Sequence, residues 1–205
     1  MLKSKFFVAV MVLAVTFVVQ AYAQAAFKLG DVVPTETVLN LVSGEKATLG
    51  DYRGKPVVLE WTNYECPFVQ KHYGSGNMQQ LQAAYVGKGV QWLSVMSSAE
   101  GKQGYLAPKD AAAAIAKADF KGTGVVLDAS GTLGKQFGAE TTPHMFVLDA
   151  EGRLVYMGAI DSIPSFNKDD VAKAENYVSK ALDEVLASKA VTTAQTRSYG
   201  CSVKY

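Results

Sequence analysis

The sequence predicts an α/β protein with one mixed β-sheet that helices cover on both faces. Short apolar runs, typical of buried strands, alternate along the chain with longer segments of helical periodicity. Towards the C-terminal end, two apolar runs flank the turn Ala150-Glu151-Gly152, as expected of a hairpin. Strands connected through helices usually run parallel, whereas a hairpin adds an antiparallel strand, so the sheet should contain both orientations.

A β-hairpin extension is expected at the start of this α/β region. Residues 37–42 have the composition of a strand, residues 43–46 (Ser-Gly-Glu-Lys) form a turn, and residues 47–49 return. The first buried strand follows at residues 57–61, the apolar run Val-Val-Leu-Glu-Trp, after the breaker Gly54-Lys55-Pro56.

One long helix is expected after this strand. It begins at Cys66-Pro67, because proline is favoured at the first helical position. It continues to about Val86, although Gly74 and Gly76 lower the helix propensity of its middle.

The remaining elements follow the same alternation. Strands are expected at residues 90–96, 124–127, 144–148 and 153–157, and helices at residues 108–119, 130–137 and 168–188. The last of these helices is amphipathic, with apolar residues at helical spacing along one face. Residues 189–205 show no period and form a C-terminal tail that carries Cys201. The globular domain is therefore assigned to residues 24–188.

The N-terminal segment has the composition of an export signal. Lys3 and Lys5 precede the apolar run of residues 6–19, and Ala21-Tyr22-Ala23 is a small-x-small cleavage site. The run is shorter than the about 20 residues that a membrane-spanning helix needs. Residues 1–23 are therefore expected to be a signal peptide, with an uncleaved anchor as the alternative. The mature protein would then be exported, to the periplasm in a double-membraned bacterium, and would not be embedded in the membrane.

Composition excludes several classes of function. The chain has 205 residues and a formal net charge of +1, and its 20 basic residues are scattered, so no nucleic-acid partner is expected. It holds two cysteines and two histidines, so that a closed four-ligand zinc site would need all four. In an oxidising compartment the two cysteines can form a lasting disulfide.

Cys66 is the candidate nucleophile. It lies where a buried strand ends and a helix begins, the edge at which ligands and chemistry gather in open α/β sheets. The free amides and partial positive charge of a helix N-terminus favour a thiolate, and they can lower the pKa of a cysteine to about 3.5–7.5. The alternative is an inert, buried cysteine that fills a gap in the core.

Several segments resemble a known family. Residues 60–69, Glu-Trp-Thr-Asn-Tyr-Glu-Cys-Pro-Phe-Val, resemble the active-site turn of thioredoxin-like proteins, and Thr142-Pro143 resembles the cis-proline loop that faces the reactive cysteine there. Residues 137–161 are similar to the redoxin branch, the AhpC/TSA or peroxiredoxin-like proteins, and residues 199–205 are similar to the end of some exported members. The resemblance spans about residues 27–187 and implies a thioredoxin-like fold.

The chain departs from both patterns of this family in ways that bear on activity. A dithiol thioredoxin has its second cysteine at the position of Val69, so the turn of this chain cannot resolve a mixed disulfide by itself. Typical peroxiredoxins carry a proline and a threonine before the reactive cysteine, where this chain has Leu59 and Asn63. Thiol–disulfide exchange is therefore expected, with peroxide reduction as an alternative.

The resemblance implies roles for residues around the turn. Glu60 would be the buried carboxylate that moves protons during thiol exchange, the alternative being a solvent-facing glutamate at the sheet edge. A cis bond before Pro143 would expose the backbone of Thr142 to a bound substrate strand. Pro67 and Trp61, beside the turn, are also expected to contact substrate.

Cys201 admits three interpretations. It is a resolving thiol that attacks an oxidised Cys66 in the same chain or a partner, one half of a structural disulfide, or unpaired. The sequence does not place it near Cys66.

His144 adjoins Pro143 and admits two interpretations. It could stabilise the Cys66 thiolate or join Cys66 in a soft-metal site, or it could be hydrogen-bonded in the core. His72 and Lys71 are expected at the surface or in packing.

The sequence therefore predicts an exported thiol–disulfide oxidoreductase that uses Cys66 as a thiolate nucleophile and Cys201 or an outside thiol for release. Its expected partners are thiols and disulfides of proteins or small molecules, peroxides under the alternative, and an external thiol reductant. No cofactor is implied. Two alternatives come from other classes: a copper carrier that uses Cys66, His144 and Cys201, and a redox-inactive adaptor whose two cysteines only fasten the tail.

Overall fold

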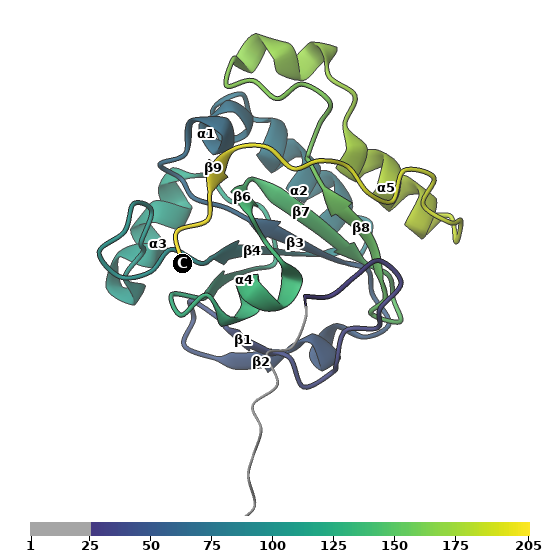
Figure 1. The fold of residues 1–205 in the computed structure, drawn as a ribbon, viewed down its shortest axis with the longest axis horizontal. Coiled ribbons are helices and arrows are strands. Elements are labelled where there is room, and N and C mark those ends of the chain that lie inside the picture. The colour runs from purple at the N-terminus through teal and green to yellow at the C-terminus, as the bar shows by residue number, and fades with distance from the viewer. Residues whose placement is uncertain (1–25) are drawn as a thin grey trace, which may run out of the picture.

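The computed structural model describes residues 26–205 and has a mixed five-stranded sheet at its centre (Figure 1). The strand order is β5-β4-β3-β7-β8, in which β3, β4 and β5 run parallel, whereas β7 and β8 join antiparallel. The bounds of the five strands are Val57–Trp61 (β3), Gln91–Met96 (β4), Gly124–Leu127 (β5), His144–Leu148 (β7) and Leu154–Gly158 (β8). The predicted mixed sheet is confirmed.

The predicted N-terminal hairpin is also present. Val38–Asn40 (β1) pairs antiparallel with Lys46–Thr48 (β2), and the 3-10 helix Leu49–Tyr52 (η1) follows. Leu41 forms a bridge with Val126, which fastens the hairpin to the edge strand β5.

Helices cover both faces of the sheet. Their bounds are Pro67–Gly74 (α1), Asn77–Val86 (α2), Pro108–Lys117 (α3), Thr132–Phe137 (α4) and Tyr177–Leu186 (α5). The hairpin and α4 pack on one face, and α2 and α5 pack on the other. Successive residues of β3 alternate between these two apolar clusters. Glu60 and Trp61, at the end of β3, are therefore directed to opposite faces of the sheet.

The single helix expected from Cys66 to Val86 is wrong, because the chain forms two helices there. Gly74 ends α1, and Gly76 precedes α2 with a φ of 76°, a left-handed conformation that glycine adopts without strain. A side chain at Gly74 would also meet Lys168, whose Nζ lies 2.5 Å from the position of an added Cβ. Both glycines thus act as breaks rather than as weak points in one helix.

The amphipathic helix expected at residues 168–188 is also interrupted. Residues Lys168–Lys173 form a 3-10 helix (η2), the chain then becomes extended, and α5 begins only at Tyr177. Asn176 starts the new helix, because its side chain accepts a hydrogen bond of 2.9 Å from the backbone N–H of Ser179. The apolar spacing continues through the break and therefore conceals it.

The tail crosses one end of the molecule and ends beside the loop that precedes β7 (Figure 1). It first follows β8, where Met157 exchanges backbone hydrogen bonds with Ala194 and Thr196. Cys201–Ser202 (β9) then pairs antiparallel with Thr141–Thr142 (β6). The unpatterned tail is thus fixed by backbone pairing, which leaves no signal of period in the sequence.

None of the helices within residues 26–205 combines the length and hydropathy needed to cross a membrane. The predicted signal peptide, residues 1–23, lies outside the described part of the chain.

Candidate active site

Cys66 lies at the junction between the central strand and the first helix, as the sequence predicts. It has an extended backbone, φ −77° and ψ 125°, and is the N-cap of α1, with Pro67 in the first helical turn. Its exposed fraction is 0%. The thiol donates a hydrogen bond of 3.1 Å to the backbone carbonyl of Thr142, across the peptide bond Thr142-Pro143, which is cis.

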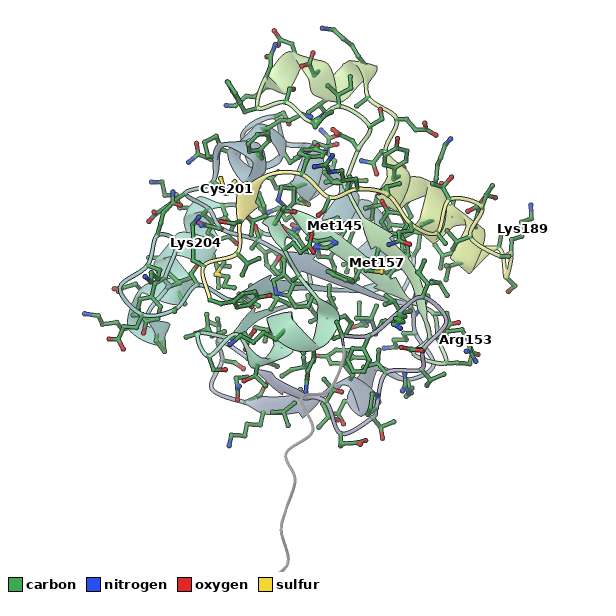
Figure 2. All side chains as sticks on the ribbon, viewed as in Figure 1. Met145, Arg153, Met157, Lys189, Cys201 and Lys204 are labelled. Carbon is green, nitrogen blue, oxygen red and sulfur yellow. The ribbon has the colours of Figure 1, made fainter. Side chains whose placement is uncertain are left out.

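The second cysteine lies directly against the first. The sulfur atoms of Cys66 and Cys201 are 2.7 Å apart, with both cysteines in the thiol form. In the β6–β9 pair, Cys201 is opposite Thr142. Figure 2 shows Cys201 on the tail, near the N-terminal end of α1. Cys201 is half-buried, whereas Cys66 is not exposed.

The two thiols have different acidities. Burial raises the pKa of Cys66, but hydrogen bonds from the Cys201 thiol and the Val69 backbone amide outweigh burial, so the net pKa lies below its ordinary value. Burial and the neighbouring charge of Cys66 raise the pKa of Cys201 to about 11. The pair therefore consists of a Cys66 that ionises first and a Cys201 that remains protonated beside it.

A buried polar cluster holds the tail next to α1. Lys71 has an exposed fraction of 0%, and its Nζ lies 3.0 Å from Oδ2 of Asp161 and 2.8 Å from the carbonyl of Ile163. The hydroxyl of Tyr199, two residues before Cys201, donates to the other carboxylate oxygen of Asp161. This cluster joins α1, the segment after β8 and the tail.

His72 belongs to the same buried cluster. Its Nε2 lies 3.2 Å from the Tyr199 hydroxyl, and its Nδ1 lies 2.9 Å from the side-chain amide of Asn77. Burial lowers the pKa of His72 to about 4, so the ring is neutral at pH 7. Of the two positions expected for His72 and Lys71, at the surface or in packing, the surface is wrong and packing is confirmed. A lysine and a histidine in an amphipathic segment give no sequence signal of burial, because their partners come from segments far along the chain.

Glu60 is fully buried on the face of the sheet that α2 and α5 cover. Its carboxylate accepts hydrogen bonds from Tyr73, Gln82, Trp92 and Ser94, at 2.8–3.0 Å. Burial raises the pKa of the Glu60 carboxyl, although these four donors oppose the rise. The solvent-facing alternative is wrong. Gln82, Trp92 and Ser94 are fully buried, and Tyr73 is half-buried. The role of Glu60 as a proton carrier stays a prediction.

The two expected substrate contacts beside the turn lie in different environments. Pro67 is exposed next to Cys66 and stays a candidate. Trp61 is fully buried between Phe137 and Phe146, with its indole N–H donating to Ser97 at 3.0 Å. Its side chain therefore packs in the core and does not reach a substrate, because it points to the face of the sheet that the hairpin and α4 cover.

His144 lies in the core, as one of its two interpretations requires. Its Nδ1 accepts from the Glu140 backbone N–H at 3.2 Å, and its ring packs at 4.4 Å from that of Phe146. Burial lowers the pKa of His144 to about 4. Across residues 26–205, no three His, Cys, Asp or Glu side chains are grouped to hold a metal ion.

Two cavities lie near the cysteines. One of about 610 Å³ is lined by the Cys66 turn and α3, including Tyr64 and Tyr105. Another, of about 560 Å³, follows the tail and is lined by Arg197, Tyr199 and Gly200 among others.

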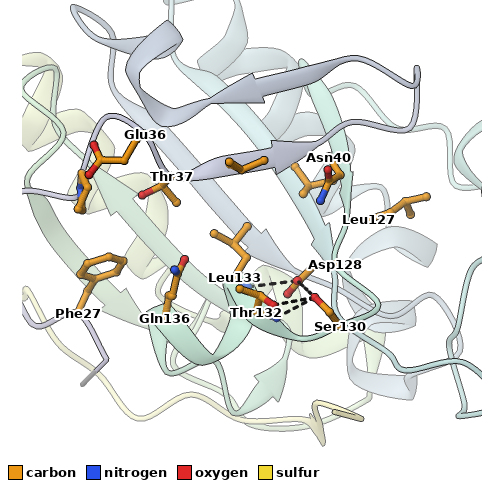
Figure 3. A pocket seen from close by; sticks show the side chains of 13 residues that line it. Phe27, Glu36, Thr37, Asn40, Leu127, Asp128, Ser130, Thr132, Leu133 and Gln136 are labelled. Atoms are coloured by element: carbon orange, nitrogen blue, oxygen red, sulfur yellow. Dashed lines mark hydrogen bonds between the residues drawn. The ribbon is translucent and has the colours of Figure 1, made fainter. Parts of the chain in front are cut away.

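A further cavity, of about 370 Å³, lies between the hairpin and α4 (Figure 3). Asp128 at its edge accepts backbone hydrogen bonds from Leu133 and Gly134 and thereby caps α4. Asp128 thus serves the fold, and neither cysteine lines this cavity.

Comparisons with known proteins agree with this geometry. A structure of a hypothetical protein from Sinorhizobium meliloti has a TM-score of 0.71 at 25% identity and covers 88% of this chain and 96% of its own. An uncharacterised conserved protein from Geobacillus kaustophilus has a TM-score of 0.70 at 23% identity, with 87% and 93% covered. A protein described as thiol:disulfide interchange protein DsbE, from Chlorobium tepidum, has a TM-score of 0.51 at 24% identity, with 64% and 85% covered. These similarities establish the thioredoxin-like fold.

No curated protein matches the sequence significantly. The sequence model of the Redoxin family, however, matches residues 28–178, a region that contains Cys66, Thr142 and Pro143 but ends before the tail. The chain thus belongs to the redoxin family.

Proposed function

We propose that this protein is an exported thiol–disulfide oxidoreductase whose redox centre is the pair Cys66 and Cys201. The observation that carries the proposal is the 2.7 Å separation of the two sulfur atoms. A disulfide bond measures about 2.05 Å, so the pair can close with a small displacement of the tail. Membership of the redoxin family supports thiol chemistry. The protein from Chlorobium tepidum, described as a thiol:disulfide interchange protein, has the same thioredoxin-like fold.

The acidities of the two sulfurs assign their parts in this reaction. Cys66 supplies the thiolate, which is the nucleophile in exchange. Cys66 is not exposed while the tail is docked, so a substrate disulfide meets it when the tail moves aside. Once the sulfur of Cys66 is bound to a substrate sulfur, its negative charge is gone, and one cause that raises the pKa of Cys201 is removed. Cys201 then loses its proton more readily and attacks Cys66. The protein disulfide forms, and the substrate sulfur leaves as a thiolate.

Peroxide reduction is the weaker candidate for the same centre. The positions that a typical peroxiredoxin fills with proline and threonine hold Leu59 and Asn63. Asn63 uses its side chain in the turn itself, where its carbonyl oxygen accepts from the Glu65 backbone N–H at 2.9 Å. These observations favour disulfides over peroxides as oxidants.

Export of the protein rests on its first residues. The charged start, apolar run and cleavage site within residues 1–23 support transport out of the cytoplasm. We infer the periplasm as the compartment in a double-membraned bacterium. Such an oxidising compartment supplies disulfides for exchange.

Equilibration of the mature protein across a glutathione redox series tests the function. Samples are quenched with an alkylating agent, and the mass of the intact protein is measured by mass spectrometry. Both thiols should convert together as one two-electron couple, at a potential above about −300 mV, and the disulfide should map to Cys66 and Cys201. The variants Cys66→Ser and Cys201→Ser should lose the couple. A disulfide that survives the most reducing buffer would show a structural staple and would overturn the proposal, as would an oxidised protein with no internal disulfide.

A further inference from the structure

We propose that outside thiols enter exchange at Cys201, while Cys66 acts as the buried sulfur that leaves. This inference rests on the proposed function and reverses the roles that the sequence suggests for reduction of the pair. In a simple active-site turn the first cysteine is the sulfur that meets the partner. Here the tail places a different sulfur on the outside.

Access to the two sulfurs is unequal. Cys66 has an exposed fraction of 0%, so a dissolved thiol cannot reach its sulfur while the tail is in place. The cavity beside the active-site turn is lined by Glu65 and Val69 but not by Cys66. Cys201 is half-buried, and the cavity of about 560 Å³ reaches Gly200, the residue immediately before it. Neither cavity is lined by a cysteine itself, so the difference in access rests on burial, which leaves Cys201 and not Cys66 partly open to solvent.

The tail also occupies the strand edge next to the cis peptide bond. Thr142 pairs with Cys201, and its hydroxyl donates to the carbonyl of Cys201 at 3.4 Å. Gly200 lies so close that an added Cβ would overlap the carbonyl oxygen of Thr142, and its φ is 133°. An extended substrate strand cannot pair with Thr142 at the same time. The tail thus excludes direct access to Cys66 along this edge.

Contacts on both sides of Cys201 keep the tail in place. On one side, Tyr199 is bound to Asp161 and packs its ring 5.8 Å from that of Phe68. On the other, the hydroxyl of Tyr205 donates to the carbonyl of Ala139 at 2.6 Å. We therefore assign Tyr199 as a positioning residue, which acts through the tail on the placement of Cys201.

The exchange can be written with all atoms and electrons accounted for. A thiolate attacks the sulfur of Cys201 in the oxidised protein, the Cys66–Cys201 bond breaks, and its electron pair leaves on Cys66. The product is a mixed disulfide between the outside thiol and Cys201. A second outside thiolate attacks the outside sulfur of this mixed disulfide and forms a free disulfide. Cys201 leaves as a thiolate and takes up one proton from water. Two outside thiols have then supplied two electrons to the protein pair.

The acidity of the pair favours the same direction. A thiol of lower pKa leaves faster in exchange. Cys66 has the lowered pKa and Cys201 the raised one, so attack at Cys201 expels the better leaving group. Access and leaving-group ability therefore agree on which sulfur is attacked.

Mapping the first mixed disulfide tests the inference. The mature protein is oxidised to the Cys66–Cys201 disulfide, mixed with reduced glutathione, quenched in acid at short times and alkylated. Peptide mass spectrometry then locates the glutathione. We expect at the earliest times at least tenfold more glutathione on Cys201 than on Cys66, with the alkylating agent on Cys66. Glutathione on Cys66, or equally on both, would overturn the inference.

Two matched variants separate positioning from general stability. Tyr199→Phe removes the hydroxyl that binds Asp161, and we expect it to raise the share of glutathione on Cys66 severalfold. Tyr85→Phe removes another hydroxyl, bonded to Ser179 and Asp183 away from the tail, and should leave the distribution unchanged. An unchanged distribution in Tyr199→Phe would overturn the positioning role.

The same samples distinguish failure of this inference from failure of the proposed function. An oxidised protein without the internal disulfide contradicts the function itself. A protein that forms the disulfide but accepts glutathione on Cys66 retains the function and loses only the inference.

Discussion

Thr142 contacts both cysteines at once: its carbonyl accepts from the Cys66 thiol at 3.1 Å, and its backbone lies opposite Cys201 in the β6–β9 pair. A single residue therefore sets the position of a helix N-cap and of a tail strand. Because Gly200 packs on the same carbonyl, the close approach of the two sulfurs depends on backbone contacts as much as on side chains.

Gly200→Ala should separate the two cysteines. The added Cβ overlaps the Thr142 carbonyl oxygen, so the tail must move away from β6. We expect disulfide formation between Cys66 and Cys201 to slow by about tenfold, since a shift of the order of 1 Å can cost about a hundredfold in rate. Stopped-flow oxidation with glutathione disulfide measures the rate.

The matched control for this change is Gly44→Ala. Gly44 also has a positive φ, 87°, but an added Cβ there meets no atom within 4 Å. The Gly44→Ala variant has the backbone strain of an alanine at positive φ but no overlap with another atom. Its rate of disulfide formation should equal that of the unchanged protein. Equal rates in both variants would contradict the role of Gly200.

Cys201→Ala should raise the pKa of Cys66. The Cys201 thiol is one of the hydrogen-bond donors that offset the burial of Cys66, and alanine removes it. The reciprocal Cys66→Ala should lower the pKa of Cys201 from about 11, because a neighbouring charge is lost while burial remains. Thiolate absorbance in the ultraviolet, followed against pH, measures both. Shifts in the opposite directions would show that the sulfurs are not in contact.

Asp161→Asn should destabilise the fold strongly. It leaves the ammonium of Lys71, whose side chain is fully buried, without its carboxylate, a change that costs about 3–5 kcal/mol in buried pairs. Adding Lys71→Met to this variant should restore much of the loss, since no unpaired charge then remains. Urea unfolding provides the free energies.

The exposed pair Lys88 and Asp183 serves as the comparison, with side chains 51% and 60% exposed. Lys88→Met should change stability by no more than about 0.5 kcal/mol. A similarly small effect for Asp161→Asn would contradict the burial of the cluster.

Glu60→Gln should flatten the dependence of stability on pH. Burial raises the pKa of the carboxyl above its ordinary 4.5, so the folded chain binds this proton more tightly than the unfolded chain does. The contribution of Glu60 to stability is therefore complete below the unfolded pKa and is lost as pH rises through the folded pKa. Relative to the unchanged protein, Glu60→Gln should gain more stability at pH 8 than at pH 4.

Denaturation series at both pH values measure this difference, with the exposed Glu151→Gln as the control. If the difference in free energy of unfolding between Glu60→Gln and the unchanged protein is the same at both pH values, the Glu60 carboxyl has the same pKa in the folded and the unfolded chain.

Arg197→Gln should weaken exchange with anionic thiols, if Cys201 is the point of entry. Arg197 lines the cavity beside the tail and forms no ion pair within residues 26–205. We expect the rate with glutathione, which carries carboxylates, to fall about two- to fivefold at low salt. The rate with a neutral thiol should not change. An equal loss with both thiols would point to a structural effect of the substitution.

Local pattern predicted the strands that are wholly or largely buried. The strands Val57–Trp61, Gly124–Leu127 and His144–Leu148 have the bounds expected from their apolar runs. Such runs carry their own signal, because nearly every residue packs against the core. The helix breaks at Gly76 and Asn176 were not predicted from the sequence. The positive φ of Gly76, 76°, and the cap at Asn176 depend on hydrogen bonds and contacts in the folded chain.

Only the parts of the candidate site that lie in short sequence motifs could be predicted from the sequence. The turn at Cys66 and the cis bond before Pro143 follow from short motifs and the resemblance that they carry. The approach of Cys201, 135 residues away, and the burial of Lys71 and His72 depend on contacts between distant segments. No period or composition records those contacts, and the tail that makes them is polar and irregular.

The two-residue pairing of β6 with β9 has a consequence for the order of events in biosynthesis. A chain that emerges N-terminus first presents Cys66 while Cys201 is still to be made. Residues 28–178, which match the Redoxin model, can bury their core before the tail is made. Cys66 then lacks Cys201, its partner cysteine in the same chain. During that interval Cys66 can pair only with other molecules. The redox centre is completed last, when the tail docks.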